Sequence, residues 1–165
     1  MRQLFSGYKL FFDLMGLGLL IIFLLPRKKA KEALPYCKKA NVLTAAERAF
    51  YLVLKESLDL NKYELLAQVR LADLVQVKPG TEKALTYFYK ISQKSPDFVV
   101  CEKTTTTPLL VIELDDASHG AADRKARDLF VDKVLAAARL PILHVPCKRS
   151  YNQVLLAQKI EEKLK

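Results

Sequence analysis

One apolar run near the start of the chain divides it into two parts of different kinds. Residues 10–25 read LFFDLMGLGLLIIFLL, apolar except for Asp13, and the basic residues 27–29 follow directly after Pro26. A helical bilayer span needs roughly 17–25 residues, so the run is at the short end and must be extended towards the N-terminus through Leu4, Phe5 and Tyr8. We therefore predict a membrane anchor over residues 1–26.

The charges after this run predict its orientation. The block PRKKAKEALPYCKK follows the apolar run, and an excess of Lys and Arg keeps a flanking segment in the cytoplasm. Residues 27–41 are therefore expected to form a basic juxtamembrane linker that can touch anionic headgroups, ahead of a cytoplasmic domain over residues 42–165. Two alternatives remain: a helix lying in the membrane interface, and a cleaved secretory signal. Against the signal, no small-residue cleavage site follows the run.

Charge and cysteine content narrow the class of the domain only slightly. The chain of 165 residues carries a net charge of +9, but residues 1–40 hold eight basic and two acidic side chains, so three positive charges remain for residues 41–165. Such a small excess neither requires nor excludes a nucleic-acid partner. Cys37, Cys101 and Cys147 form no CxxC pair, which argues against a disulfide framework and a zinc site. Cys101 and Cys147 lie in apolar runs and are expected to be buried free thiols.

The periodicity of the domain predicts alternating helices and strands around one sheet. The capping-box pattern Thr44 to Glu47 begins a helix over about 45–58, and a strand follows in the first half of 63–77. Apolar runs over 97–101 and 109–114, joined by the threonines 104–107, predict a hairpin at the sheet centre with both faces buried. Three further helices and a strand are expected. The first helix is capped by Thr81 and buries Ala84, Leu85, Phe88 and Ile91; the second runs over about 121–139 and buries Ala126, Phe130, Val134 and Ala137. A strand over 142–145 follows, and a last helix over 150–164 buries Val154, Leu155 and Ile160.

Carboxylates stand at the ends of the two central strands. Asp97 opens one strand, and Glu113 and Asp115 close its neighbour on one shared face, because side chains alternate along a strand. If the strands pair, Asp97 approaches that face. Converging carboxylates suit a hard cation such as Mg²⁺, which activates water for attack on a phosphodiester. The alternative is that these groups cap loops and make salt bridges at the sheet edge.

These residues carry a resemblance to a known superfamily. Ser95-Pro96-Asp97, then residues 112–116 (IELDD) and His119, resemble the PD-(D/E)XK nucleases near the very-short-patch-repair endonucleases. The sequence is most similar to the bacterial family called domain of unknown function 2726, through residues 97–99 (DFV), 112–119 (IELDDASH), 127–128 (RD) and 140–143 (LPIL). The resemblance covers about residues 42–148. It implies an α/β fold with a restriction-endonuclease-like core, α-β-α-β-β-α-β, whose central mixed sheet is flanked by helices. With the anchor, it places a single-pass protein at the bacterial inner membrane.

Carried over residue by residue, the resemblance implies a set of roles. Asp97 and Glu113 would bind Mg²⁺ or Mn²⁺, and Glu47 would support them, although its place in the capping box already explains a glutamate there. His119 would act as a general acid or base. Further residues that could face the site or contact nucleic acid are Gln68 and Arg70 before the second strand and Lys125 and Arg127 on the following helix.

One departure from the superfamily pattern concerns Asp115. It stands where the third motif position carries a lysine, which would stabilise developing negative charge. Either His119, Lys125 or another basic residue substitutes, or the site is degenerate; the repair-endonuclease branch also lacks this lysine.

Three classes of function follow from this pattern. The first is a membrane-anchored, divalent-metal-dependent nuclease acting on DNA rather than RNA. The second is a catalytically degenerate nuclease-fold module that binds nucleic acid or a protein partner at the membrane. The third is a membrane-associated structural protein in which the acidic cluster is incidental. The sequence leaves the oligomeric state open.

Overall fold

The computed structural model describes residues 15, 33–115 and 122–165, with the side chains of 122–128 outside the description. Residues 39–165 form one compact unit. The anchor predicted over residues 1–26 lies outside the described residues except for Met15. Within the described ranges, no helix is both long enough and apolar enough to cross a membrane.

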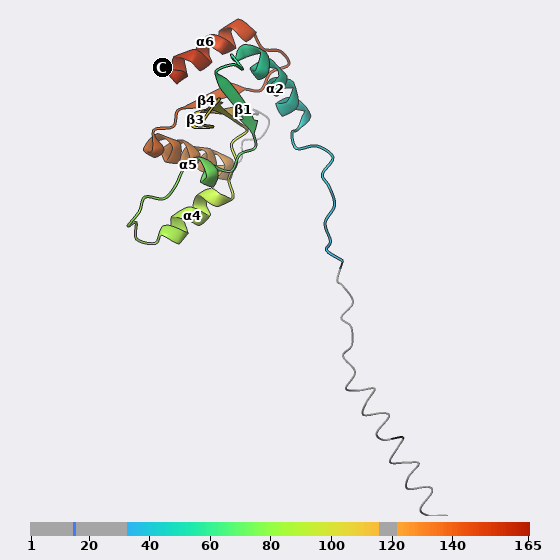
Figure 1. Cartoon of the computed structure of the whole chain (residues 1–165), viewed down its shortest axis with the longest axis vertical. Helices are drawn as coiled ribbons and strands as arrows, with labels where there is room; N and C mark the ends of the chain where they lie inside the picture. Colours follow the sequence, from blue (N-terminus) through green and yellow to red (C-terminus); the bar gives the residue numbers. More distant parts are fainter. Residues whose placement is uncertain (1–14, 16–32, 116–121) are drawn as a thin grey trace, which may run out of the picture. The chain divides into compact units, whose positions relative to one another are not determined.

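A four-stranded mixed sheet forms the centre of the domain (Figure 1). Its strands are β1 (Tyr63–Ala67), β2 (Phe98–Glu102), β3 (Pro108–Asp115) and β4 (Ile142–Pro146), in the spatial order β1-β2-β3-β4. The β1–β2 and β2–β3 pairs are antiparallel, and β4 runs parallel to β3. The expected hairpin at the sheet centre and the mixed α/β architecture are confirmed.

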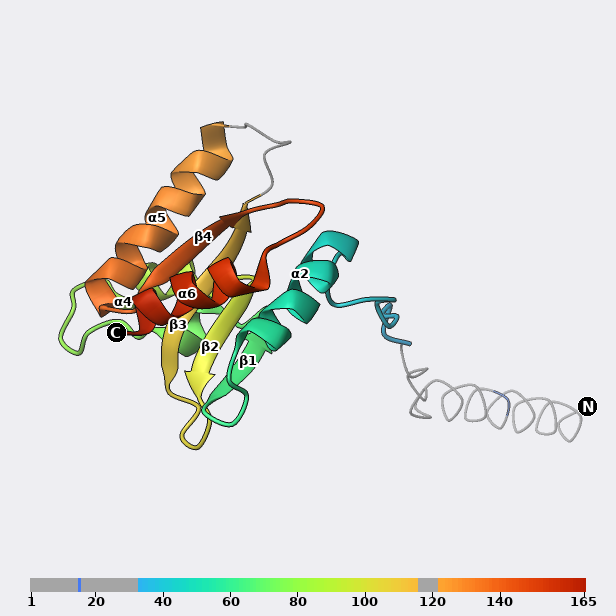
Figure 2. The same cartoon turned by 90° about the horizontal axis from the view of Figure 1, so that it is seen from above.

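Helices cover both faces of the sheet, so the domain has three layers (Figure 2). On one face lie α2 (Ala45–Ser57) and α6 (Gln153–Leu164). The other face is covered by α3 (Leu71–Leu74), α4 (Ala84–Ser92) and α5 (Ala122–Ala138). The element order agrees with the predicted one except for α3, a single turn that periodicity could not reveal.

Alternation along the central strands separates two hydrophobic cores. Phe98 and Val100 point to the α2 and α6 side, where they meet Phe50, Leu54, Leu156 and Ile160. Val99 and Cys101 point to the other side, where they meet Leu71, Ile91, Val131 and Leu135. Among the residues that the structure describes, the members of both cores all lie within 39–165, which is the basis for using this fragment in experiments. Cys101 is buried as expected, whereas Cys147 follows β4 and is half-buried.

The capping box at the start of α2 is confirmed. The Thr44 backbone N–H donates to Glu47 Oε2 at 2.7 Å, and the Glu47 N–H donates to Thr44 Oγ1 at 3.2 Å. These two bonds satisfy donors that a helix N-terminus otherwise leaves without partners, which fixes where α2 begins.

The predicted inward faces of α5 and α6 are confirmed only in part. In α5, Phe130 and Val134 are half-buried and pack against the core as predicted, but Val131 and Leu135 are buried more deeply and Ala137 is exposed. The side chain of Ala126 lies outside the described residues. Helix α6 buries Ile160 as predicted, but its second buried residue is Leu156, and Val154 and Leu155 are 66% and 56% exposed. Both segments offer more than one apolar stripe at helical spacing, and contact with the twisted sheet selects between them.

The prediction for α4 is also wrong in detail. Its N-cap is Lys83, which has a left-handed backbone (φ 55°) and makes no side-chain cap, so Thr81 does not begin the helix. Only Ile91 is buried, while Leu85 and Phe88 are exposed. The helix meets the rest of the domain near its C-terminal turn, so most of its apolar residues remain in solvent.

Candidate functional site

A row of polar side chains crosses the sheet at one register position, where β1, β3 and β4 end and β2 begins. One residue beyond the Ala67–Phe98 pair, the Gln68 N–H donates to the Asp97 carbonyl at 2.9 Å. One residue beyond the Phe98–Ile112 pair, Asp97 stands beside Glu113, and Glu113 is paired with His144 of β4. The row Gln68, Asp97, Glu113, His144 therefore draws one residue from each strand or its immediate extension.

Asp97 is fixed by its neighbours. Its Oδ2 accepts the Leu114 backbone N–H at 2.9 Å, and its Oδ1 lies 3.5 Å from Gln68 Nε2. The Gln68 amide also donates to Glu47 Oε1 at 3.3 Å, so it links the first helix to the row. Gln68 makes both contacts from a left-handed backbone (φ 54°) directly after β1, a conformation that turns its amide back across the strand end.

The electrostatics of the row show an excess of negative charge. Burial raises the pKa of Glu113 to about 8, and the negative charge of Asp97 adds to this shift. The pKa of Asp97 is raised too, first by burial, against which the Leu114 hydrogen bond acts, and also by the charge of Glu47. None of the ion pairs among the described residues involves these three carboxylates. A cation bound beside these carboxylates would offset the unfavourable energy of ionising them together.

His144 forms a second cluster with two carboxylates. Its Nδ1 lies 3.1 Å from Asp115 Oδ1, and its Nε2 lies 3.1 Å from Asp132 Oδ1 on α5. Partial burial lowers the pKa of His144, but the hydrogen bonds to Asp115 and Asp132 outweigh it, and the pKa ends above its ordinary value. An imidazolium can donate from both nitrogens at once, so this arrangement favours the charged form.

The structure brings some of the predicted site residues together and places others elsewhere. Asp97, Glu113, Glu47 and Gln68 gather around one point, whereas the carboxylate of Asp115 contacts His144. His119 and the side chains of Lys125 and Arg127 lie outside the described residues. Arg70 makes two bonds to Asp73, at 2.9 and 2.8 Å, at the start of α3.

His144 was not predicted from the sequence as a site residue. The only signal there is one ionisable side chain inside the apolar run Ile142 to Val145. Its relevance depends on the parallel pairing of β4 with β3, which places it beside Glu113 and which the sequence does not state.

The donor set determines which metal the row could hold. Among the described residues, no group of three or more His, Cys, Asp or Glu side chains is arranged to hold a metal ion. Asp97 and Glu113 alone supply two carboxylates, which is the protein share that Mg²⁺ commonly takes while it keeps several water ligands. The two carboxylates therefore fit Mg²⁺ or Mn²⁺ better than a metal that requires a full cage of protein ligands.

Comparison with known proteins identifies the family of the domain. Residues 39–164 match the family model described as "Protein of unknown function (DUF2726)", so the chain belongs to that family. No curated protein and no solved structure matches the chain.

Proposed function

We propose that this chain is a divalent-metal-dependent nuclease of the PD-(D/E)XK superfamily that acts on nucleic acid, DNA rather than RNA. The observation that carries the proposal is the pair Asp97 and Glu113, adjacent across β2 and β3 at a strand end, both with raised pKa values. Burying like charges together is unfavourable, and such groups concentrate at functional sites. The agreement of the element order with a restriction-endonuclease-like core adds to the argument.

Each residue of the row has a defined task in this proposal. Asp97 and Glu113 would hold Mg²⁺ or Mn²⁺, and the Leu114 N–H and the Gln68 amide keep Asp97 oriented towards Glu113. When bound, the metal would supply Lewis-acid activation of a water molecule for attack on the phosphodiester. Glu47 acts through Gln68 as a positioning residue, since its Oε1 accepts from the same amide that contacts Asp97.

The absence of the superfamily lysine is the main argument for an alternative function. Asp115 occupies that position and contacts His144, so the imidazole of His144, paired with Glu113 on β4, is the candidate to replace the lysine. If that group cannot replace the lysine, the domain would bind nucleic acid or a protein partner without cutting.

We include the N-terminal segment in the proposal as a membrane anchor over residues 1–26, on the strength of its apolar run and basic flank.

The proposal is tested by cleavage assays on fragment 39–165 with single-stranded DNA, duplex DNA and RNA in Mg²⁺ or Mn²⁺. Asp97→Asn and Glu113→Gln are expected to lower the cleavage rate by roughly 100-fold or more, because each removes a metal-binding charge. Glu102→Gln is the control, since Glu102 lies at the other end of β2 and should leave the rate unchanged. No cleavage of any substrate, together with no metal-dependent gain in thermal stability, would refute the nuclease function. Salt-sensitive binding without cleavage would favour the alternative.

A further inference from the structure

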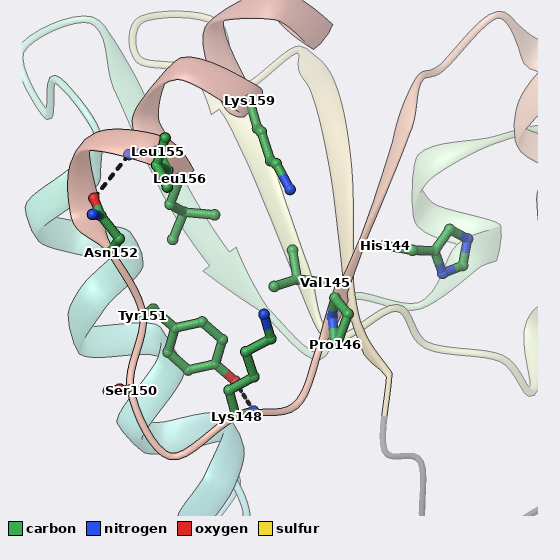
Figure 3. A pocket seen from close by; sticks show the side chains of 10 residues that line it. All are labelled: His144, Val145, Pro146, Lys148, Ser150, Tyr151, Asn152, Leu155, Leu156 and Lys159. Atoms are coloured by element: carbon green, nitrogen blue, oxygen red, sulfur yellow. Dashed lines mark hydrogen bonds between the residues drawn. The ribbon is translucent and has the colours of Figure 1, made fainter.

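A hollow of about 200 Å³ opens between the end of β4 and the start of α6. Val145 and Leu156, both buried, belong to its floor, and Tyr151 forms one wall (Figure 3). The ring of His144 points away from the hollow, as the alternation along β4 requires. The hollow is therefore separate from the acidic row, which lies on the other face of the sheet.

Two lysines direct their charges into this space. Figure 3 shows the ammonium groups of Lys148, from the loop after β4, and Lys159, from α6, both pointing into the hollow. Neither lysine takes part in an ion pair within the described part of the chain. Two positive charges that face one space repel each other, and an anion between them would convert that repulsion into attraction.

Packing and hydrogen bonds hold the backbone on both sides of the hollow. The Tyr151 ring packs against Phe50 of the core, with 4.7 Å between ring centroids. The Tyr151 hydroxyl accepts the Lys148 backbone N–H at 2.9 Å, which fixes the loop that carries this lysine. At the other side, the Asn152 side chain accepts the Leu155 N–H at 3.1 Å and fixes the start of α6. The hollow is thus formed in advance of any ligand.

The hollow lies at the same end of the sheet as the acidic row. Pro146, which lines it, is paired in register with Asp115, two residues beyond Glu113 on β3. Within the plane of the sheet, two strand residues and one strand spacing separate the two places, on the order of 8 Å, and a path between them also crosses the strand end from one face to the other. A nucleic-acid strand that presents one phosphodiester to Glu113 could therefore place a nearby phosphate in the hollow.

We propose that the hollow between β4 and α6 binds a phosphate group of a nucleic-acid strand between Lys148 and Lys159. This inference rests on the proposed function, because it adds a binding position for the substrate to the same site. The apolar floor and the Tyr151 wall suit the sugar or base beside that phosphate, whereas the two ammonium groups supply the charge. Lys148 and Lys159 are binding residues in this scheme, and the acidic row does the chemistry.

The test measures binding separately from cleavage. Fluorescence anisotropy in EDTA follows a labelled 12-nucleotide single strand binding to fragment 39–165, and to its variants Lys148→Gln and Lys159→Gln, at several salt concentrations. Each variant should bind about 5–10-fold more weakly, and the slope of log K against log salt should fall by about 0.7 for each phosphate that the variant no longer neutralises. Lys163→Gln is the matched control, because it removes the same charge from the exposed end of α6 and should change the affinity less than about 2-fold.

Further measurements separate this inference from its rivals. Unchanged midpoints of thermal unfolding establish that the variants fold. Inorganic phosphate should compete with the oligonucleotide for binding to the native fragment, but not to the variant that carries both Lys148→Gln and Lys159→Gln. Equal effects of all three lysine substitutions would overturn the proposal, since general charge would then explain the binding. Binding to phosphatidylglycerol vesicles without oligonucleotide binding would also overturn it, in favour of a lipid headgroup.

The outcomes also distinguish this inference from the proposed nuclease function. Oligonucleotide binding that depends on Lys148 and Lys159 in a fragment that cuts nothing would refute the nuclease and support the phosphate site. Cleavage with the same KM in both lysine variants would support the nuclease and overturn the phosphate site.

Discussion

The substitution Glu113→Gln should stabilise the metal-free domain, by an amount that grows as the pH rises above about 4.5. Glu113 has a pKa of about 8 in the folded chain, against an ordinary value of 4.5, because burial and the charge of Asp97 disfavour its ionised form. The folded chain therefore binds this proton more tightly than the unfolded chain. The stability linked to it is complete below about pH 4.5 and is lost progressively as the pH rises to 8.

The size of the effect follows from the same two values. The difference between the two pKa values sets an upper limit of roughly 5 kcal/mol, reached at pH 9, on the gain in unfolding free energy from Glu113→Gln. Because Glu113 keeps some access to solvent and shares its proton with Asp97, a gain of about 2–3 kcal/mol is the realistic expectation. A glutamine has nearly the same shape and no charge at any pH, so Glu113→Gln escapes this loss without leaving a cavity.

Urea unfolding of fragment 39–165 in EDTA, from pH 4.5 to pH 9, measures this difference directly. The gain from Glu113→Gln should be near zero at pH 4.5 and should grow with pH, whereas Glu161→Gln, at an exposed position of α6, should show no such trend. Added Mg²⁺ should stabilise the native fragment and not the variant, by about 2.7 kcal/mol at 100 times the dissociation constant. A gain that stays constant across the pH range would refute the electrostatic argument.

Two further predictions concern α6 and β4. Leu156→Ala should lower the unfolding free energy by about 2–5 kcal/mol, because Leu156 is buried. Val154→Ala, at an exposed position, should change it by less than about 0.5 kcal/mol. Equal losses for the two variants in urea unfolding would contradict the helix face that the structure shows. His144→Gln should destabilise the domain most below about pH 6.5, because the raised pKa of His144 gives stability that is lost as the pH rises through it. Asp132→Asn should reduce this pH dependence, and thermal unfolding at pH 5.5 and 8.5 measures both.

The strands were easier to predict than the faces of the helices. The runs around β2 and β3 are apolar without interruption and are bounded by Asp97 and the threonine loop, so both their position and their burial follow from composition. In α6, by contrast, Val154, Leu155, Leu156 and Ile160 are all apolar, and the sequence contains no reason to prefer one pair. That choice is made by the contact with α2 and the sheet, which is a tertiary effect.

Glu47 shows why the site could be predicted only in part. The sequence offered two explanations for this residue, a capping role and a role beside the acidic strands, and they looked like competitors. The structure is compatible with both, because Oε2 accepts the Thr44 N–H while Oε1 accepts from the Gln68 amide that also contacts Asp97; the cap is confirmed, and the role at the site stays a prediction. The bond that begins α2 therefore also orients the oxygen that faces the row, and a change at Glu47 must affect helix stability and the site together. Sequence spacing can identify the cap, since its partners are three residues apart, but not the second contact, whose partners are separated by 21 residues and a strand.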